Sequence, residues 1–142
     1  DEGLVEGEAF ATLRQRRLLG VEVHILADVM VKHAVPPGPY DLGLMARETI
    51  NRGLADGLIV SGPATGMPAV TEDVETVRRA LPDGLLLVGS GVNPENAQAL
   101  LARADGAIVG TWLKQNGVIT SPIDPERVRR MYAAIKNVAD VV

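Results

Sequence analysis

The stretch Ala55-Asp56-Gly57-Leu58-Ile59-Val60 returns later in the chain as Ala104-Asp105-Gly106-Ala107-Ile108-Val109. Each copy places an Asp-Gly pair before a short aliphatic run. Asp and Gly tolerate tight backbone turns, and a continuous aliphatic run is typical of a buried parallel strand. The two aspartates lie 49 residues apart (105 − 56), which is room for two strand–helix units of about 25 residues each. The repeat therefore predicts successive βαβ units.

Two further aliphatic runs complete the pattern. The four runs cover residues 21–31, 57–60, 85–88 and 107–109, and a helical pattern follows each of them. Alternation of this kind predicts a parallel α/β sheet. An eight-unit barrel takes about 250 residues, and this chain has 142. We therefore expect a single domain over residues 1–142, the C-terminal half of a TIM (β/α)8 barrel with strands 5–8.

The expected helices carry start and stop signals. Residues 6–19 have helical spacing, and Gly20 follows as a stop. Thr71 is expected to cap one helix, while Asn93 and Asp124 each precede a proline at the first helical position. The last helix is expected to present one apolar stripe. That stripe consists of Val128, Met131, Tyr132, Ile135 and Val138.

An open, doubly wound sheet is the competing architecture, because it shares the βαβ pattern. Its fingerprint is a GxGxxG turn after the first strand. Gly89-Ser90-Gly91 is followed by Val92-Asn93-Pro94 and has no third glycine. The barrel is the favoured interpretation.

Composition excludes several classes of protein. The net charge is −4 with a pI of about 5.1 and no basic run, so nucleic acid is not an expected partner. No stretch is long and apolar enough for a membrane span, no signal peptide is evident, and cysteine is absent. We expect a cytoplasmic protein without disulfides. Because the sequence starts at Asp1 without Met, we also expect a piece of a longer chain.

The ends of the third and fourth strands are candidates for phosphate binding. Glycines let the backbone approach an anion closely, and a capped helix start adds free N–H groups. In barrels, the loops after strands 7 and 8 often form such a site together with a short extra helix. The alternative is that the glycines only make tight turns. The candidate residues are Gly89, Ser90, Gly91, Asn93, Gly110 and Thr111, with Lys114 as a counter-charge.

Asp28, Lys32 and His33 are the candidate catalytic residues. Alternation puts Asp28 and Lys32 on one face of the first strand. Charges on a buried strand are costly unless they are paired or face a lumen, so we expect both at the mouth of the barrel. The alternatives are a structural Asp28–Lys32 ion pair and a loop role for His33. His24 is expected to be structural.

The loop after the second strand supplies Gly62, Thr65 and Gly66, which could contact a small ligand or form an ordinary Gly/Pro turn. The sequence has no HExxH motif and no nucleophile elbow. We therefore predict no metal site and no cofactor.

Several segments, taken in this order, resemble the BtpA family. The most specific are the Asp-Val-x-Val-Lys-His motif at 28–33 and the Gly-Ser-Gly-Val-Asn motif at 89–93. The other matching segments are 3–7 with 13–17, 55–62, 65–66, 104–111, Lys114 and Gly117. The likeness extends over nearly the whole chain.

The resemblance implies a barrel similar to those of ribulose-phosphate binders, in chains about twice this length. It also implies two functions of different classes. One is binding of a phosphorylated small molecule, as an enzyme or a former enzyme. The other is assembly or stabilisation of a membrane protein complex such as photosystem I. A second copy of the chain, or the remainder of the barrel, is the expected protein partner.

Overall fold

The computed structural model describes residues 3–31, 34–62 and 67–139. Within them lies one parallel sheet of four strands in the sequential order β1-β2-β3-β4. The strands are β1 (Leu26–Asp28), β2 (Gly57–Val60), β3 (Leu86–Val88) and β4 (Gly106–Ala107). The helices are α1 (Ala9–Leu19), α2 (Leu42–Asn51), α3 (Thr71–Ala80), α4 (Ala97–Leu101) and α5 (Pro125–Ala139), with short 3-10 turns η1 (Thr111–Leu113) and η2 (Gln115–Gly117). The predicted alternation of four parallel strands with helices is confirmed.

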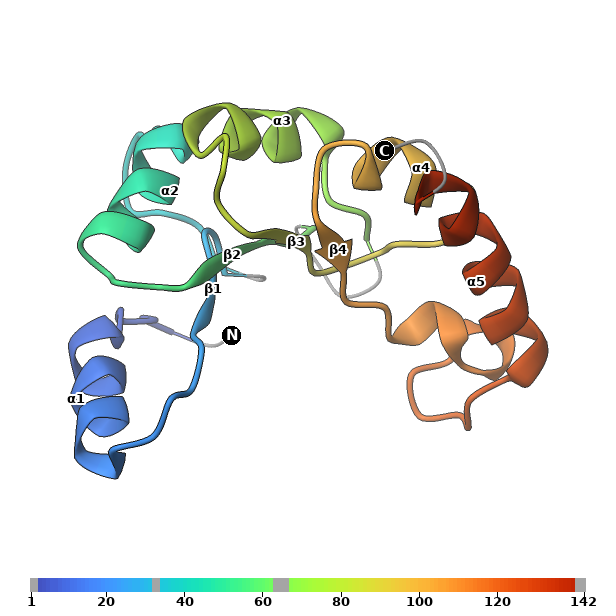
Figure 1. Ribbon diagram of the computed structural model, residues 1–142, viewed down its shortest axis with the longest axis horizontal. Coiled ribbons are helices and arrows are strands. Elements are labelled where there is room, and N and C mark those ends of the chain that lie inside the picture. Colours follow the sequence, from blue (N-terminus) through green and yellow to red (C-terminus); the bar gives the residue numbers. More distant parts are fainter. Residues whose placement is uncertain (1–2, 32–33, 63–66, 140–142) are drawn as a thin grey trace.

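The sheet forms an arch with helices on one side only. Helices α2, α3 and α4 follow its convex side, and α1 and α5 stand at its two ends (Figure 1). The core lies between the sheet and these helices, where aliphatic side chains from both layers are fully buried. It includes Leu58, Val60, Leu86 and Val88 from the strands, and Ala46, Val74, Val77 and Leu100 from the helices. This is half of a barrel wall with its outer helices.

The concave side of the arch corresponds to the lumen of a barrel. The register pairs Leu26 with Gly57 on the face opposite to Leu58. Leu26 and Leu85 are 40% and 44% exposed there, although both are aliphatic. A Cβ on Gly57 would lie 2.8 Å from Leu26 Cδ2 and 3.0 Å from Leu85 Cδ2. The glycine leaves room for its two larger neighbours, which is how side chains fill a barrel interior in layers.

The outer two strands are shorter than the sequence predicts. Of the expected strand at residues 21–31, only Leu26–Asp28 pairs with β2. Of residues 107–109, only Ala107 belongs to β4, which begins one residue earlier. Each outer strand has one neighbour, and a strand is defined only where a neighbour donates or accepts hydrogen bonds. The aliphatic run therefore overstates the length of a strand at the edge of a sheet.

The predicted helix signals are partly right. Gly20 ends α1 in the left-handed conformation, as expected. Asn93 Oδ1 accepts from the backbone N–H groups of Glu95 and Asn96, and Asp124 Oδ1 accepts from that of Glu126. Thr71 is not a cap, because it is the first residue of α3 and follows Val70, which has no side-chain cap bond.

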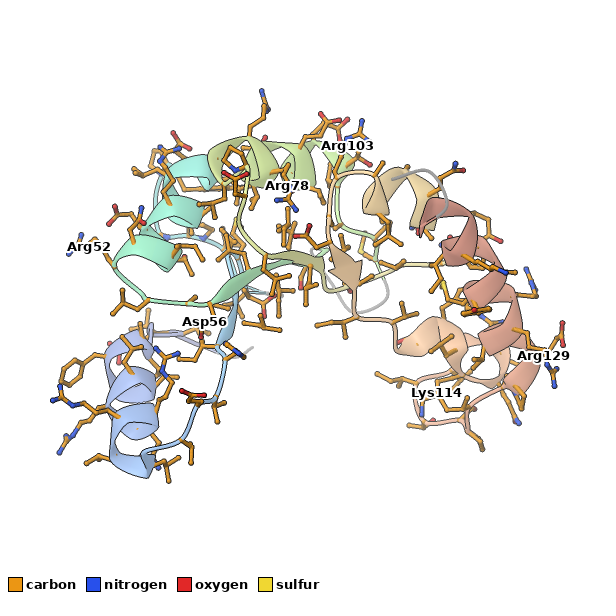
Figure 2. All side chains as sticks on the ribbon, viewed as in Figure 1. Arg52, Asp56, Arg78, Arg103, Lys114 and Arg129 are labelled. Atoms are coloured by element: carbon orange, nitrogen blue, oxygen red, sulfur yellow. The ribbon has the colours of Figure 1, made fainter. Side chains whose placement is uncertain are left out.

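The two repeated aspartates do more than make turns. Asp56 Oδ2 accepts from Ile25 N–H at 2.7 Å and from Arg16 Nη1 at 2.8 Å. Asp105 Oδ2 accepts from Leu86 N–H at 2.8 Å and from Arg78 Nη2 at 2.7 Å. In both copies one carboxylate oxygen joins the start of the preceding strand to an arginine of the helix before it. We call each of these a carboxylate clamp; Figure 2 labels Asp56 and Arg78.

The clamps lower the pKa of both carboxyls. For Asp56, the Ile25 N–H is the main cause, and Arg16 adds to it. For Asp105, partial burial opposes the charged form, but the bonds from Leu86 N–H and Arg78 together outweigh it and lower the pKa. A carboxyl with a lowered pKa stabilises the fold above its unfolded-state pKa of about 3.9, and this stabilisation is lost as the pH falls through the folded-state pKa.

We predict that Asp105→Asn lowers the free energy of unfolding by about 1 kcal/mol at neutral pH, because the charge-assisted bond to Arg78 is lost. The matched control is Asp83→Asn, since Asp83 is an exposed turn residue. Urea unfolding of the three chains measures the difference. The gap between wild type and Asp105→Asn should narrow as the pH falls from about 7 to about 3. A gap that is constant over this range would contradict the role of the clamp.

Candidate functional site

The carboxyl ends of the four strands lie along one rim of the arch, opposite to the clamps. Asp28 ends β1, and its Oδ1 accepts a hydrogen bond of 2.8 Å from the hydroxyl of Ser61, which follows β2. Asp28 pairs in register with Ile59 and is exposed. The carboxylate therefore lies on the concave side, where the sequence predicts it. Lys32 and His33, the other predicted catalytic residues, lie outside the described residues.

Gly89, which follows β3, lies close to Ser61, the partner of Asp28. A Cβ at Gly89 would lie 2.5 Å from Ile59 Cγ2 and 2.6 Å from the Ser61 hydroxyl. Both distances are too short for real atoms, so only glycine fits here without displacing Ser61. Ser61 begins the candidate loop after the second strand, but it was not among the predicted site residues. The signal available was its position directly after the strand.

Gly62 and Gly91 pack two loops together through their backbones. A Cβ on Gly62 would collide with the carbonyl oxygen of Met67, and one on Gly91 would collide with the backbone of Pro68. Gly91 also has a φ of +64°, a conformation that side-chain-bearing residues rarely adopt. For these two glycines, packing alone explains the residue type. Thr65 and Gly66, predicted in the same loop, lie outside the described residues.

A cavity of about 360 Å³ lies between the ends of β3 and β4. Six of the seven residues predicted for phosphate binding line it. These are Gly89, Ser90, Gly91, Asn93, Gly110 and Thr111. Ser90 is 5% exposed, which makes it the one buried polar residue among those described. Residues from two strand ends thus meet at one hollow, as the sequence predicts for a binding site.

The backbone at this cavity leaves N–H groups available. Among the described residues, none accepts a hydrogen bond from the N–H of Gly91, Gly110 or Thr111. The backbone N–H groups before the start of α4, in contrast, already donate hydrogen bonds to side chains. Asn93 Oδ1 takes the N–H groups of Glu95 and Asn96, and Asn96 Oδ1 takes that of Asn93. The donors available to an anion are those of the loops rather than those of a helix end.

The cation at the cavity is Arg127, not Lys114. Arg127 lines the cavity from the first turn of α5, and its guanidinium lies 4.4 Å from the centre of the Trp112 ring. Its Nε donates to the Trp112 carbonyl, and the side chain is one of those that line the hollow. Lys114 follows η1, where its backbone bridges to Ile123, and it is not among the lining residues. Figure 2 labels Lys114 on this limb of the arch.

Arg127 was missed because the sequence of α5 was analysed only for its apolar stripe. The available signal was the cap: Asp124-Pro125 fixes where the helix begins and so which residues lie in its first turn. A first-turn residue of the helix after the last strand points toward the rim of a barrel. The Trp112 ring then holds the guanidinium in place.

A second cavity, of about 390 Å³, lies at the ends of β1 and β2 and is mostly apolar. Ser61 and Gly62 line it together with Tyr40 and Asp73. Within the described parts of the chain, no three His, Asp or Glu side chains come together as metal ligands would. In the same residues, no helix has the length and apolar character that crossing a bilayer requires.

Comparison with known proteins gives the family. The model of the BtpA family matches residues 1–137. The chain belongs to the BtpA family. Its relatives include the photosystem I biogenesis protein BtpA of a Synechocystis species, 46% identical, with 95% of this chain and 47% of that protein covered. An uncharacterized protein of Pyrococcus furiosus is 44% identical over 91% of this chain and 48% of its own length. The chain spans about half the length of the curated relatives it matches.

Solved structures agree on the fold. A native KDPGal structure matches with a TM-score of 0.58 and 14% identity, over 88% of this chain and 54% of that one. The N-(5'-phosphoribosyl)anthranilate isomerase of Pyrococcus furiosus also matches with a TM-score of 0.58, at 18% identity, over 92% and 58%. Both are TIM-barrel-like proteins. The likeness establishes a half-barrel arrangement and, at this identity, nothing about activity.

Proposed function

We propose that this part of a BtpA-family barrel holds the phosphate of a phosphorylated small molecule, such as a sugar phosphate. The observation that carries the proposal is the cavity between β3 and β4, which is lined by Arg127 and by Gly91, Gly110 and Thr111, whose backbone N–H groups have no acceptor among the described residues. A guanidinium supplies two parallel donors that match the oxygens of a phosphate. The hydroxyls of Ser90 and Thr111 would add two further donors.

The size of the cavity suits a small ligand. At about 360 Å³ it lies near the lower end of the range for small-molecule pockets, which is roughly 300–1,000 Å³. A phosphate group would occupy only part of this volume. The remainder of the ligand would extend along the rim toward Ser61 and Asp28.

Gly110 differs from the glycines that packing explains. Gly62 and Gly91 fit closely against a neighbouring backbone, but a Cβ on Gly110 would have nothing within 4 Å. Its φ of −120° and ψ of −82° lie outside the α and β regions that residues with side chains prefer, so the backbone conformation favours glycine. The open space beside Gly110 leaves room for a ligand to approach the backbone closely, as the proposal requires.

We predict that Gly110→Val weakens binding of inorganic phosphate or a sugar phosphate by at least about 1 kcal/mol, or about fivefold, because the side chain fills the place of the anion. Gly38→Val is the matched control, since Gly38 also has open space around it but lies away from the cavity. Isothermal titration calorimetry measures both. Equal affinities in the two variants would contradict the proposal.

Thr111→Val tests the same site without adding bulk. The substitution replaces a hydroxyl with a methyl group and should weaken phosphate binding severalfold, while thermal unfolding stays unchanged. If phosphate binds the wild type and Thr111→Val binds it equally well, the hydroxyl is not a ligand contact.

For a reaction, we propose that Asp28 and Lys32 act at the mouth of the barrel, with His33 as a proton carrier. The bond between Asp28 and Ser61 supports the part of this proposal that concerns Asp28, because it holds the carboxylate at the rim. Lys32 would bind an anionic group or act as an acid, base or amine. We also propose that the protein is cytoplasmic, as expected from the sequence.

We predict that Lys32→Ala removes turnover of the phosphorylated compound that binds best in a titration panel, while the unfolding temperature stays within about 2 °C of wild type. Turnover and thermal unfolding are measured on the same preparations. Loss of the fold together with activity would instead favour a structural ion pair between Lys32 and Asp28.

A second candidate function is assembly or stabilisation of a membrane protein complex. The 46% identical relative named as a photosystem I biogenesis protein favours it. Expression of this chain in a Synechocystis strain that lacks its own BtpA protein tests it. Restored photosystem I content would support this function, and an unchanged deficit would count against it.

A further inference from the structure

The loop between β3 and α4 is held by a side chain that lies outside the proposed phosphate site. Asn96, which is half-buried and directly precedes α4, accepts from the Asn93 N–H through Oδ1 at 2.8 Å. Its Nδ2 donates to the Gly91 carbonyl at 3.0 Å. One side-chain amide thus bridges two backbone groups on either side of Val92. Among the described residues, neither backbone group has another hydrogen-bond partner.

Asn93 returns the contact through its own side chain and carbonyl. Its Oδ1 accepts from the N–H groups of Glu95 and Asn96 at 2.9 Å and 3.0 Å. Its carbonyl accepts from the Ala97 N–H at 2.9 Å. The two asparagines therefore fix each other across the turn that leads into α4. All of these bonds lie within the protein, so the turn is closed without a ligand.

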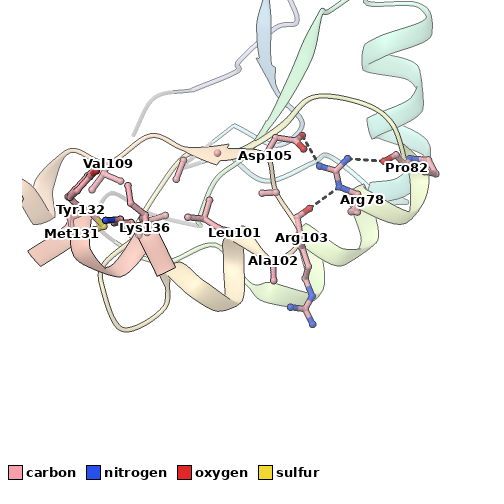
Figure 3. A pocket seen from close by; sticks show the side chains of 15 residues that line it. Arg78, Pro82, Leu101, Ala102, Arg103, Asp105, Val109, Met131, Tyr132 and Lys136 are labelled. Carbon is pink, nitrogen blue, oxygen red and sulfur yellow. Dashed lines mark hydrogen bonds and ion pairs between the residues drawn. The ribbon is translucent and has the colours of Figure 1, made fainter. Parts of the chain in front are cut away.

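Helix α4 gives Asn96 a rigid support. Ala97 and Leu100 of this helix are buried in the core. Behind the helix, the Arg103 carbonyl accepts from Arg78 Nε at 2.8 Å, so an arginine of a carboxylate clamp also holds the far end of α4 (Figure 3). A helix packed along its length and held at its far end keeps its place. Asn96 can therefore hold the loop against it.

The bridge sets the direction of the backbone donors in the loop. A trans peptide unit places its C=O and N–H on opposite sides, and the Gly91 carbonyl is turned toward Asn96. The Val92 N–H belongs to the same peptide unit and therefore points away from Asn96. Like the Gly91 N–H, it has no acceptor among the described residues, and both residues line the cavity between β3 and β4. Successive N–H groups in a turn form a concavity that suits an anion.

We propose that Asn96 is a positioning residue for phosphate binding, which fixes the peptide between Gly91 and Val92 before the ligand arrives. The inference rests on the proposed function, because it assigns Asn96 a role at the same site. Asn96 is not among the residues that line the cavity, so it acts through the loop and not on the ligand. Donors that are already in place spare the ligand the entropic cost of ordering a loop.

The variant Asn96→Ala removes both bonds of the bridge and tests this role. If the freed loop spends about one-tenth of its time in the present arrangement, the Kd for inorganic phosphate rises about tenfold. Isothermal titration calorimetry measures the Kd at a temperature at which every variant is folded by thermal unfolding. Gln98→Ala is the matched control, because Gln98 carries an exposed amide on α4. Its Kd should equal that of wild type. Loss of stability alone would lower the unfolding temperature and leave the Kd of the folded chain unchanged.

A second variant, Asn96→Asp, keeps an acceptor for the Asn93 N–H and removes only the donor to the Gly91 carbonyl. Gln98→Asp controls for the added charge, and phosphate should bind about fivefold more weakly to Asn96→Asp than to this control. Backbone 15N relaxation without phosphate reports on the loop directly. The order parameters of the Gly91 and Val92 N–H groups should fall from about 0.85 in wild type to below about 0.6 in Asn96→Ala.

The outcomes separate this inference from the function on which it rests. If wild type binds phosphate and Asn96→Ala binds it equally well, Asn96 positions nothing and the proposed function stands. Unchanged order parameters at Gly91 and Val92 also overturn the inference, because other contacts then hold the loop. A wild type that binds no phosphate overturns the proposed function and this inference together. Where Asn96→Ala does not fold, the comparison of Asn96→Asp with Gln98→Asp decides by the same criteria.

Discussion

The carboxylate clamp is the interaction on which the rest of this half-barrel depends. A short parallel strand has few hydrogen bonds of its own, and β1 and β4 pair over only three and two residues. Asp56 and Asp105 each add an acceptor at the point where the ladder begins, and each ties that point to an arginine of the preceding helix, α1 or α3. A net hydrogen bond is worth about 1 kcal/mol, more when charged. The clamps therefore join strand and helix at the end of the sheet opposite to the proposed phosphate site.

The clamps and the proposed ligand site consequently lie at opposite ends of the strands. The two carboxyls whose pKa is lowered both belong to the clamps. At the other end, close backbone contacts hold the loops in place: Gly89 against Ser61, and Gly91 against Pro68. Such contacts leave N–H groups and side chains of the rim unused by the fold. A rim built in this way can bind an anion without giving up bonds on which the sheet relies.

Much of the fold could be predicted because it follows from local pattern. The repeated Asp-Gly hexapeptide and the four aliphatic runs predicted the parallel sheet, and the two glycine-rich strand ends predicted which residues line the cavity. What could not be predicted depends on neighbours distant in sequence. The length of β1 is set by β2, the bond from Ser61 to Asp28 spans 33 positions, and Arg127 reaches the cavity only because α5 returns to the rim. Lys114 lies closer in sequence to the end of β4, but it is not among the residues that line the cavity.

The open concave side links the fold to the function. A ligand held at the ends of β3 and β4 contacts only part of a barrel rim, because a complete barrel has four more strand ends facing this one. The residues that line the cavity beside Arg127 all belong to this chain, so the proposed phosphate site can be tested on it alone. Asp28, in contrast, ends the outermost strand and faces the open lumen. If a reaction takes place beside Asp28, some of the groups around it must therefore come from the strands that complete the barrel. Under the proposed function, the phosphate site therefore belongs to this half-barrel, whereas a reaction at Asp28 would depend on the part that completes the barrel.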